Sequence, residues 1–402
     1  MKQGWEIKPL KEFLEVQNGY AFNSKLFNNT DGMPLIRIRD LKNGRNTKVK
    51  FVGKYDEKYV VTKGDFLIGM DGEFGCYEWI GDDALLNQRV CRLQDFKNDL
   101  IPKFLFHGIN KYLKDIEDVT TYTTVKHISS KQIKGITFPI PPLDEQKRIV
   151  AKLDECFEAI HIARTNVEKN LSNAKELFQS QLNQIFASTG SATDGDSPEL
   201  AEGWVEKKLG DITTILGDGL HGTPKYTIDG EYYFINGNNL DNGKIIYKNR
   251  TKRASFGEYE KYKKNLNDRT VFVSINGTLG NVAFYNNEKV ILGKSACYFN
   301  LTEQADKNFI KYVILSPYFI DYAHKVATGA TIKNVSLKSM RELKINLPKI
   351  EEQKEIVILL DTLQSQTQSL ESNYQQELEA LDELKKSILQ KAFRGELTID
   401  NG

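Results

Sequence analysis

Residues 141–147 read Pro-Pro-Leu-Asp-Glu-Gln-Lys, and 207 residues further on, residues 348–354 read Pro-Lys-Ile-Glu-Glu-Gln-Lys. In each stretch proline comes just before acidic residues. This is the pattern of a helix N-terminus, because proline fits the first turn and carboxylates favour the positive end of the helix dipole. Two such starts in a chain of 402 residues predict two copies of one unit, each ending in a long helix.

The repeat extends to both sides of these helix starts. The matched pairs include Trp5 and Trp204, Gly72 and Gly277, Lys126 and Lys333, and Phe186 and Phe393. The offset within these pairs rises from 199 to 205 residues and then stays at 207. A changing offset followed by a constant one indicates that insertions fell only in the first part of each unit. Each unit therefore has a variable globular part and a part of fixed length.

The globular parts are predicted to be mixed α/β domains, because short β-rich runs are broken by Gly, Asn and Asp turns. The predicted strands are Pro34–Ile38, Asp65–Ile68, Val271–Ile275 and Val282–Tyr285, and the predicted helices are Lys103–Ile116 and Asn308–Lys325.

The parts of fixed length are predicted to be two long helices with a coiled-coil spacing of apolar residues. The first seam is Ile149, Leu153, Cys156, Ile160, Ala163, Val167, Leu171, Ala174, Leu177 and Ile185, and the second is Ile356, Leu360, Leu363, Leu370, Tyr374, Leu378, Leu381, Leu384 and Ile388. Connectivity favours antiparallel pairing of the two helices, with a pseudo-two-fold internal repeat. The alternative is that each helix packs only on its own globular domain.

Composition limits the class of protein. The chain has no apolar run long enough to span a bilayer, and residues 1–11 have no signal-peptide pattern. The four cysteines lie far apart and the histidines show no metal-ligand spacing, so we expect neither a disulfide framework nor a metal site. A reducing cytoplasm fits this usage.

Charge is divided unequally along the chain. Residues 1–143 hold 22 Lys and Arg against 18 Asp and Glu, and residues 201–349 hold 22 against 15. Residues 144–200 hold 6 against 10, and residues 350–402 hold 5 against 11. Basic globular parts suit contact with nucleic-acid phosphates, whereas acidic helices do not.

Candidate DNA-binding residues are cationic, amide, imidazole and hydroxyl side chains in the globular parts. Arg suits guanine and Asn suits adenine in the major groove, so an exchange of Arg for Asn between the copies would suit two different half-sites. Ordinary turn-forming Asn and surface Arg remain the alternative for each position. The candidates are Arg37, Arg39, Arg45, Lys48, Lys50, Gln88, Arg89, Thr123, Lys126, His127, His221, Lys225, Asn236, Asn238, Asn239, Arg250, Lys252, Arg253, Lys294, Thr331, Lys333 and Asn334.

Catalytic motifs are not found. The sequence has neither a phosphate-binding P-loop nor the Asn-Pro-Pro-aromatic motif of amino-methyltransferases. Glu342-Leu343-Lys344 has the Glu-x-Lys spacing of metal-dependent nucleases, but chance is the simpler reading in a chain rich in Lys and Glu. We expect a chain without catalytic residues.

These features together resemble the specificity subunit of Type I restriction–modification systems, over essentially the whole chain. The resemblance rests on the repeat, on the Glu-Gln-Lys helix starts, and on residues 389–397, Leu-Gln-Lys-Ala-Phe-Arg-Gly-Glu-Leu, at the end of the second helix. Residues 182–187, at the end of the first helix, depart from that ending.

The resemblance implies an α+β chain of two target recognition domains, residues 1–142 and 203–348. They would be separated by a central helical region, residues 143–188, a linker, residues 189–202, and a C-terminal helical region, residues 349–402. Each domain would bind one half of a bipartite, asymmetric sequence in double-stranded DNA, and the helices would set the spacing between the halves.

The resemblance also implies the partners. The helices would bind two methyltransferase subunits, and restriction subunits with translocase and nuclease activity would join the complex. S-adenosylmethionine, ATP and Mg²⁺ would belong to those partners and not to this chain. The partner-binding residues expected on the helices are Gln146, Gln353, Phe186 and Phe393. Two alternatives remain: the DNA-reading subunit of a restriction–methylation enzyme outside Type I, and a coiled-coil scaffold without a DNA role.

Overall fold

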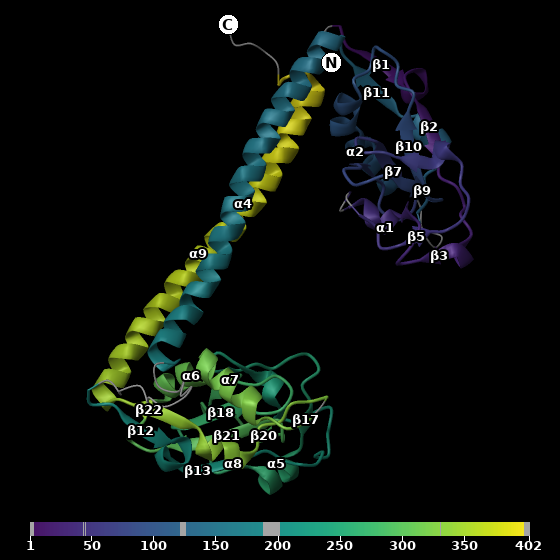
Figure 1. Ribbon diagram of the computed structural model, residues 1–402. Coiled ribbons are helices and arrows are strands. Elements are labelled where there is room, and N and C mark those ends of the chain that lie inside the picture. Colours follow the sequence, from purple (N-terminus) through teal and green to yellow (C-terminus); the bar gives the residue numbers. More distant parts are fainter. Residues whose placement is uncertain are drawn as a thin grey trace, which may run out of the picture. The chain divides into compact units, whose positions relative to one another are not determined.

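The computed structural model describes residues 4–42, 44, 46–120, 126–187, 202–329 and 331–397. The chain divides into two compact units, one formed by Met1–Asn166 with Glu377–Gly402 and the other by Val167–Gln376. Each unit contains one globular domain and a portion of each of two 45-residue helices, α4 (Leu143–Ala187) and α9 (Ile350–Arg394) (Figure 1). The predicted linker lies almost entirely outside the described residues.

The described residues of the first domain form three β-sheets. A four-stranded antiparallel sheet has the order β2-β10-β7-β8, a five-stranded mixed sheet has the order β3-β5-β4-β9-β6, and β1 pairs with β11. The strands are β1 (Glu6–Pro9), β2 (Glu15–Asn18), β3 (Phe27–Asn28), β4 (Met33–Ile36), β5 (Lys50–Phe51), β6 (Val60–Val61), β7 (Phe66–Gly69), β8 (Gly75–Glu78), β9 (Ala84–Leu86), β10 (Val90–Gln94) and β11 (Thr137–Ile140). Its helices are α1 (Ile38–Leu41), α2 (Pro102–Val119) and α3 (Ser130–Lys134).

The second domain repeats this plan. Its four-stranded sheet β13-β21-β18-β19 corresponds to β2-β10-β7-β8, its pair β12-β22 to β1-β11, and its parallel pair β14-β20 to β4-β9. The strands are β12 (Val205–Lys208), β13 (Thr213–Asp218), β14 (Tyr232–Ile235), β15 (Leu240–Asp241), β16 (Lys244–Ile245), β17 (Arg253–Ala254), β18 (Thr270–Ser274), β19 (Val282–Phe284), β20 (Val290–Leu292), β21 (Ala296–Leu301) and β22 (Lys344–Leu347). Its helices are α5 (Phe256–Tyr262), α6 (Lys307–Leu315), α7 (Pro317–Val326) and α8 (Leu337–Glu342).

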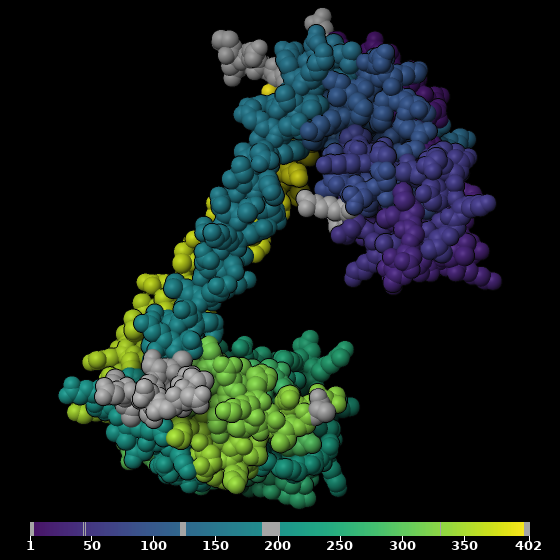
Figure 2. All heavy atoms as spheres, in the orientation of Figure 1, coloured from purple at the N-terminus to yellow at the C-terminus, as the bar shows by residue number. Residues whose placement is uncertain are grey.

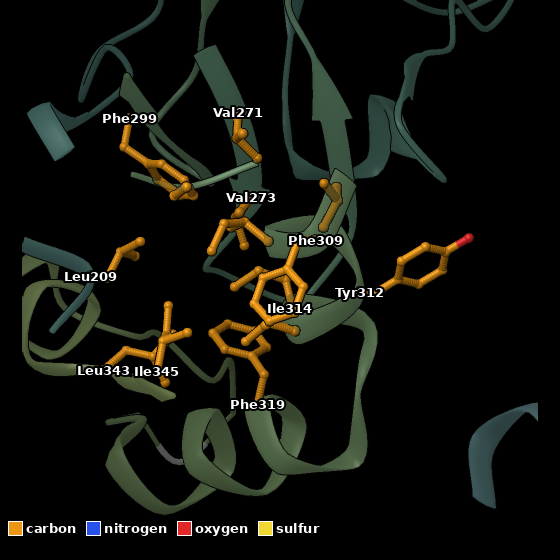
Figure 3. Packing of buried hydrophobic residues seen from close by; sticks show 14 of the residues in the cluster. Leu209, Val271, Val273, Phe299, Phe309, Tyr312, Ile314, Phe319, Leu343 and Ile345 are labelled. Atoms are coloured by element: carbon orange, nitrogen blue, oxygen red, sulfur yellow. The ribbon is translucent and has the colours of Figure 1, made fainter. Parts of the chain in front are cut away.

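Helices cover one face of each four-stranded sheet. In the second domain, Val271 and Val273 of β18 pack with Phe309 of α6 and Phe319 of α7 in one buried cluster (Figure 3). In the first domain, the corresponding cluster joins the sheet to α2. Alternate residues of the strands therefore supply the core, and the loops at the strand ends remain at the surface.

Each globular domain is held to the start of its helix by a tryptophan. Trp5 Nε1 donates a hydrogen bond to Glu145 Oε2 at 3.1 Å, and Trp204 Nε1 donates one to Glu352 Oε1 at 2.8 Å. The repeated Gly-Trp and Glu-Gln motifs, more than 100 residues apart within each copy, thus form one joint.

A buried glutamine completes each joint. Gln146 is fully buried; its side chain accepts a hydrogen bond from the Ile101 amide and donates to the carbonyls of Asp99 and Pro141. The equivalent bonds of Gln353 involve Asp306, Gln304 and Pro348. Burying an amide is favourable only when its polar atoms are bonded, which explains why both copies carry glutamine here.

The two long helices pair antiparallel, as predicted. In the first unit, Ile149 and Leu153 near the start of α4 share a core cluster with Ala392 near the end of α9. In the second unit, Leu182 near the end of α4 shares one with Leu360 near the start of α9. The alternative, in which each helix packs only on its own domain, is therefore wrong. No described helix is long and apolar enough to cross a membrane.

Two details of the sequence prediction are wrong. Leu177, Leu370 and Leu384 are exposed. On α4 the neighbouring buried residues are Ala174 and Leu182, which leaves Leu177 on the outer face. The helix predicted over Asn308–Lys325 is two helices, because Pro317 lacks a backbone N–H and disfavours helical geometry at Ser316. Ser316 instead caps α7 by accepting a hydrogen bond from the Phe319 amide.

Candidate nucleic-acid interface

The two domains hold a pair of neighbouring loops with the same backbone hydrogen bonds. In the first domain, the Gly72 amide after β7 donates to the Lys126 carbonyl at 2.9 Å. In the second, the Gly277 amide after β18 donates to the Lys333 carbonyl at 3.1 Å. Both glycines have φ near +80°, a conformation that favours glycine. The loop after each strand is thereby tied to the segment before α3 or α8.

In the first domain these loops bring three charged or titratable side chains together. His127 Nδ1 lies 2.6 Å from Asp71 Oδ1, and Arg89 Nη1 lies 3.3 Å from Asp71 Oδ2. The side chains of Arg89 and His127 are 57% and 46% exposed, whereas that of Asp71 is 22% exposed. We call Asp71, Arg89 and His127 the first corner. Its carboxylate holds two side chains that remain open to solvent.

In the second domain the positions equivalent to Asp71 and His127 carry amides. Asn276 Nδ2 donates to Asn334 Oδ1 at 3.1 Å, and we call these two residues the second corner. They line a hollow of about 330 Å³ together with His221 and Lys294. His221 Nε2 lies 2.5 Å from Asp218 Oδ2 in the same hollow.

Some of the DNA-binding residues predicted from the sequence lie at the corners, namely Arg89 and His127 in the first and Asn334 in the second, and His221 and Lys294 line the hollow of the second corner. Arg39 lines a second hollow that contains Asp71. Other predicted residues are exposed elsewhere on the two domains; these are Lys48, Gln88, Lys225, Asn238, Arg250, Lys252, Arg253, Thr331 and Lys333. Arg45 and Thr123 lie outside the described residues.

The amino-acid sequence of the chain matches the model of a known protein family. The family model described as "Type I restriction modification DNA specificity domain" matches residues 2–171 and 201–380, so both copies of the repeat are covered. The chain belongs to this DNA specificity family. It is a sequence-specificity subunit of a Type I restriction–modification system, and the reading as a scaffold without a DNA role is wrong.

Relatives match over the full length. The chain is 29% identical to the EcoBI specificity subunit of Escherichia coli, over 98% of this chain and 86% of that protein. It is 26% identical to the EcoKI specificity subunit of Escherichia coli strain K12, over 99% and 90%.

Solved structures share the fold. A structure from work on complex assembly and conformational transition of the type I R-M system matches with a TM-score of 0.71 at 21% identity, covering 99% of both chains. The HsdS subunit from Thermoanaerobacter tengcongensis matches with a TM-score of 0.59 at 20% identity, covering 99% of this chain and 98% of that one.

Several residues predicted to contact DNA have structural roles in this specificity subunit. Asn239 is buried, and its amide accepts a hydrogen bond from the Asn236 amide and donates to the Ile246 carbonyl. This bonding leaves Asn239 no surface with which to contact DNA, so that assignment is wrong. Arg37, Lys50, Lys126 and Asn236 are half-buried and bonded within the chain.

The residues expected to bind partner subunits also lie in the interior. Gln146 and Gln353 are fully buried, Phe186 is 3% exposed, and Phe393 packs against Phe104 at a centroid distance of 5.1 Å. Phe186 packs edge-on against Phe309 at a centroid distance of 5.5 Å. These four side chains hold the domains on the helices, so we correct their assignment from partner contact to internal packing.

The sequence analysis missed Asp71, Asp218 and Asn276. Asp71 and Asn276 each precede a glycine of the repeat, and this position is the signal that would have identified them. Asp218 ends β13 inside residues 217–222, Gly-Asp-Gly-Leu-His-Gly, which have the spacing of a dinucleotide-binding loop. The first described helices after this stretch are the 3-10 turn Gly237–Asn239 and α5, so no helix N-terminus follows it to hold a pyrophosphate.

The thiols of Cys76, Cys91 and Cys297 are buried. Burial raises the pKa of the Cys91 thiol to about 12, which leaves it protonated and unreactive at neutral pH. Within the described residues, no group of three His, Cys, Asp or Glu side chains could hold a metal ion.

Proposed function

We propose that each globular domain binds one half of a bipartite, asymmetric DNA site and that α4 and α9 fix the number of bases between the halves. The observation that carries this proposal is the repeat itself. The four-stranded sheet, the two-stranded sheet, the joints and the loop hydrogen bonds recur in both domains, yet the solvent-exposed side chains at the corners differ. A common frame with different surface chemistry suits two readers of two different sequences.

The finer assembly follows from the charge division and the family resemblance. The helices are acidic and expose apolar side chains such as Ile162 and Ile358, and Figure 2 draws the atoms of both helices as spheres. Such surfaces suit protein partners better than phosphates. We assign this surface to two methyltransferase subunits, which restriction subunits join.

The chemistry would reside in those partners. S-adenosylmethionine, ATP and Mg²⁺ are assigned to the methyltransferase and restriction subunits, which would act in the cytoplasm on an adenine of each half-site. This chain would recognise the DNA sequence and would contribute no catalytic residue.

Methylome sequencing tests the role of the whole chain. A host carrying this chain and its neighbouring methyltransferase gene is compared with a strain in which only this chain is deleted. We expect the deletion to remove adenine methylation at one split motif with a fixed unread gap. An unchanged methylome, with expression of all subunits verified, contradicts the proposal.

Exchange of one domain tests whether each domain recognises one half-site independently of the other. The first domain is moved onto another specificity subunit of the family, with the exchange made at the Trp5–Glu145 joint. We expect exactly one half-site to move with it, since the domain carries its own core. Transfer of both half-sites, or of neither, contradicts modular reading.

A further inference from the structure

We propose that the two corners are the points at which the domains read a base, and that the first corner reads a guanine whereas the second reads an adenine. This inference rests on the proposed function, because it assigns residues within domains already taken to read half-sites.

The corners occupy the same place in the repeated frame. The Met70 amide donates to the Arg89 carbonyl, as the Ile275 amide does to the Ser295 carbonyl. The Ile128 amide donates a hydrogen bond to the Met70 carbonyl, and the Val335 amide donates one to the Ile275 carbonyl. The backbone is therefore held alike in both domains, and Asp71 and His127 correspond to Asn276 and Asn334. By the same bonds Arg89 corresponds to Ser295, and of these two residues only Arg89 has a positive φ, so the backbone at this position and the side chains offered to solvent both differ.

The first corner presents a guanidinium. Arg89 has a φ of 72°, a left-handed conformation that costs a non-glycine residue on the order of 1 kcal/mol and is concentrated at functional sites. Asp71 contacts only Nη1, so within the described residues the other N–H groups of the guanidinium fork have no protein partner. A fork of parallel donors matches the O6 and N7 acceptors of guanine.

The second corner presents one acceptor and one donor. The bond from Asn276 Nδ2 to Asn334 Oδ1 leaves Asn276 Oδ1 and Asn334 Nδ2 without a side-chain partner among the described residues. Adenine offers the complementary pair in the major groove, an N6 donor and an N7 acceptor. Lys294 and His221 line the same hollow and are placed to contact the neighbouring phosphates.

Contact with phosphate alone explains these corners less well. A phosphate is bound by donors and cations, whereas the first corner contains the Asp71 carboxylate and the second exposes an amide acceptor. Acceptors of this kind repel a phosphate but can meet the donor groups of a base edge. The corners are therefore suited to bases rather than to the backbone.

The test measures competition binding by the complete complex. The competitors are DNA duplexes that carry every single-base change in the motif found by methylome sequencing. The variants are Arg89→Ala, Arg89→Lys, Asn276→Ala and Asn334→Ala. Lys111→Ala and Asn286→Ala are the matched controls, since each removes an exposed side chain of the same kind from the same domain.

We expect both Arg89 variants to lose roughly 10- to 100-fold of the preference for guanine at one position of one half-site, because lysine cannot replace the bidentate fork. The two Asn variants should lose a similar preference for adenine at one position of the other half-site. The controls should change no preference, and affinity for unrelated DNA should fall about equally in Arg89→Ala and Lys111→Ala.

Three outcomes overturn the inference: a first half-site without a G·C pair, unchanged preferences in variants with unchanged melting temperatures, or a uniform loss of affinity across all duplexes. If the domain exchange still moves one half-site, only the assignment of the corners fails. If the domain exchange transfers neither half-site, the proposed function fails as well.

Discussion

His107 and Tyr312 occupy equivalent places at which each domain meets a long helix. His107 Nε2 lies 3.2 Å from Asp154 Oδ1, and the Tyr312 hydroxyl donates to Asp361. In Figure 3 the Tyr312 hydroxyl points away from the buried cluster. Burial lowers the pKa of His107, and the hydrogen bond to Asp154 opposes this shift only in part. The two domains therefore use different groups for one contact, and only the first can titrate near neutral pH.

The stability of the first domain should depend on pH through His107. Because the folded-state pKa lies below the usual value of about 6.5, the neutral form stabilises the fold above that pH. The contribution is lost as the pH falls through 6.5 toward the folded-state pKa. In denaturant titrations between pH 7.5 and 5, His107→Tyr should show a smaller loss than the parent. His161→Gln, at an exposed site on α4, is the control, and equal slopes for parent and His107→Tyr would contradict the assignment.

The buried glutamines should be costly to remove. Gln146→Ala leaves the Ile101 amide and two carbonyls without their partner, so we expect a loss of about 2–3 kcal/mol in the unfolding of the first unit. Gln353→Ala should cost as much in the second unit. Gln375→Ala, exposed on α9, serves as the control, and a loss below about 0.5 kcal/mol in either buried variant would show that the joint does not depend on glutamine.

At the scale of elements, close packing decides where helix α2 meets helix α9. A Cβ added at Gly108 of α2 would lie 2.4 Å from Cε1 of Phe393 and 2.6 Å from Cζ of Phe138. Both rings belong to one aromatic cluster, with a centroid separation of 5.7 Å, so neither can move without disturbing the other. Glycine is thus required here by contact, although it weakens the helix itself.

Two glycine substitutions separate contact from helix propensity. Gly108→Ala should destabilise the first unit by about 1–3 kcal/mol because of overpacking. Gly257→Ala in α5, where no atom lies within 4 Å of the added Cβ, should be neutral or stabilise the second unit by up to about 1 kcal/mol. Thermal and denaturant unfolding of the full chain would show this, and equal effects of the two changes would contradict it.

The elements show where local patterns suffice. Prolines and acidic residues predicted both starts of the long helices, Leu143 and Ile350, because helix signals act over a few residues. The predicted strands fall on β4, β7, β18 and β19, although Ile38 begins α1. The prediction of buried residues on the long helices was wrong where packing against a tertiary partner decides which face is buried, as at Leu177. Several faces of a long amphipathic helix have similar apolar spacing in the sequence.

For the whole molecule, the division of charge predicts the salt dependence of DNA binding. Each lost phosphate contact lowers the slope of log affinity against log salt by about 0.9. Lys294→Gln and Lys333→Gln, at exposed positions of the basic second domain, should each reduce the slope by about that amount. Lys386→Gln, which removes an ion pair with Glu383 on the acidic α9, should not. Equal changes of slope would show that the domains and the helices contact DNA alike.

The sequence by itself determined the repeat and the two long helices, because these depend on spacing along the chain, but the role of Gln146 and Gln353 in the joints came from the tertiary structure. The sequence also separated basic domains from acidic helices, since charge is additive. The tertiary structure alone decided which polar residues act together: Asp71 and His127 are 56 residues apart, yet they form a hydrogen bond. It likewise buried Asn239 and left Arg89 exposed. Contacts of this range arise from strand pairing and loop closure, which no local pattern of residue types encodes.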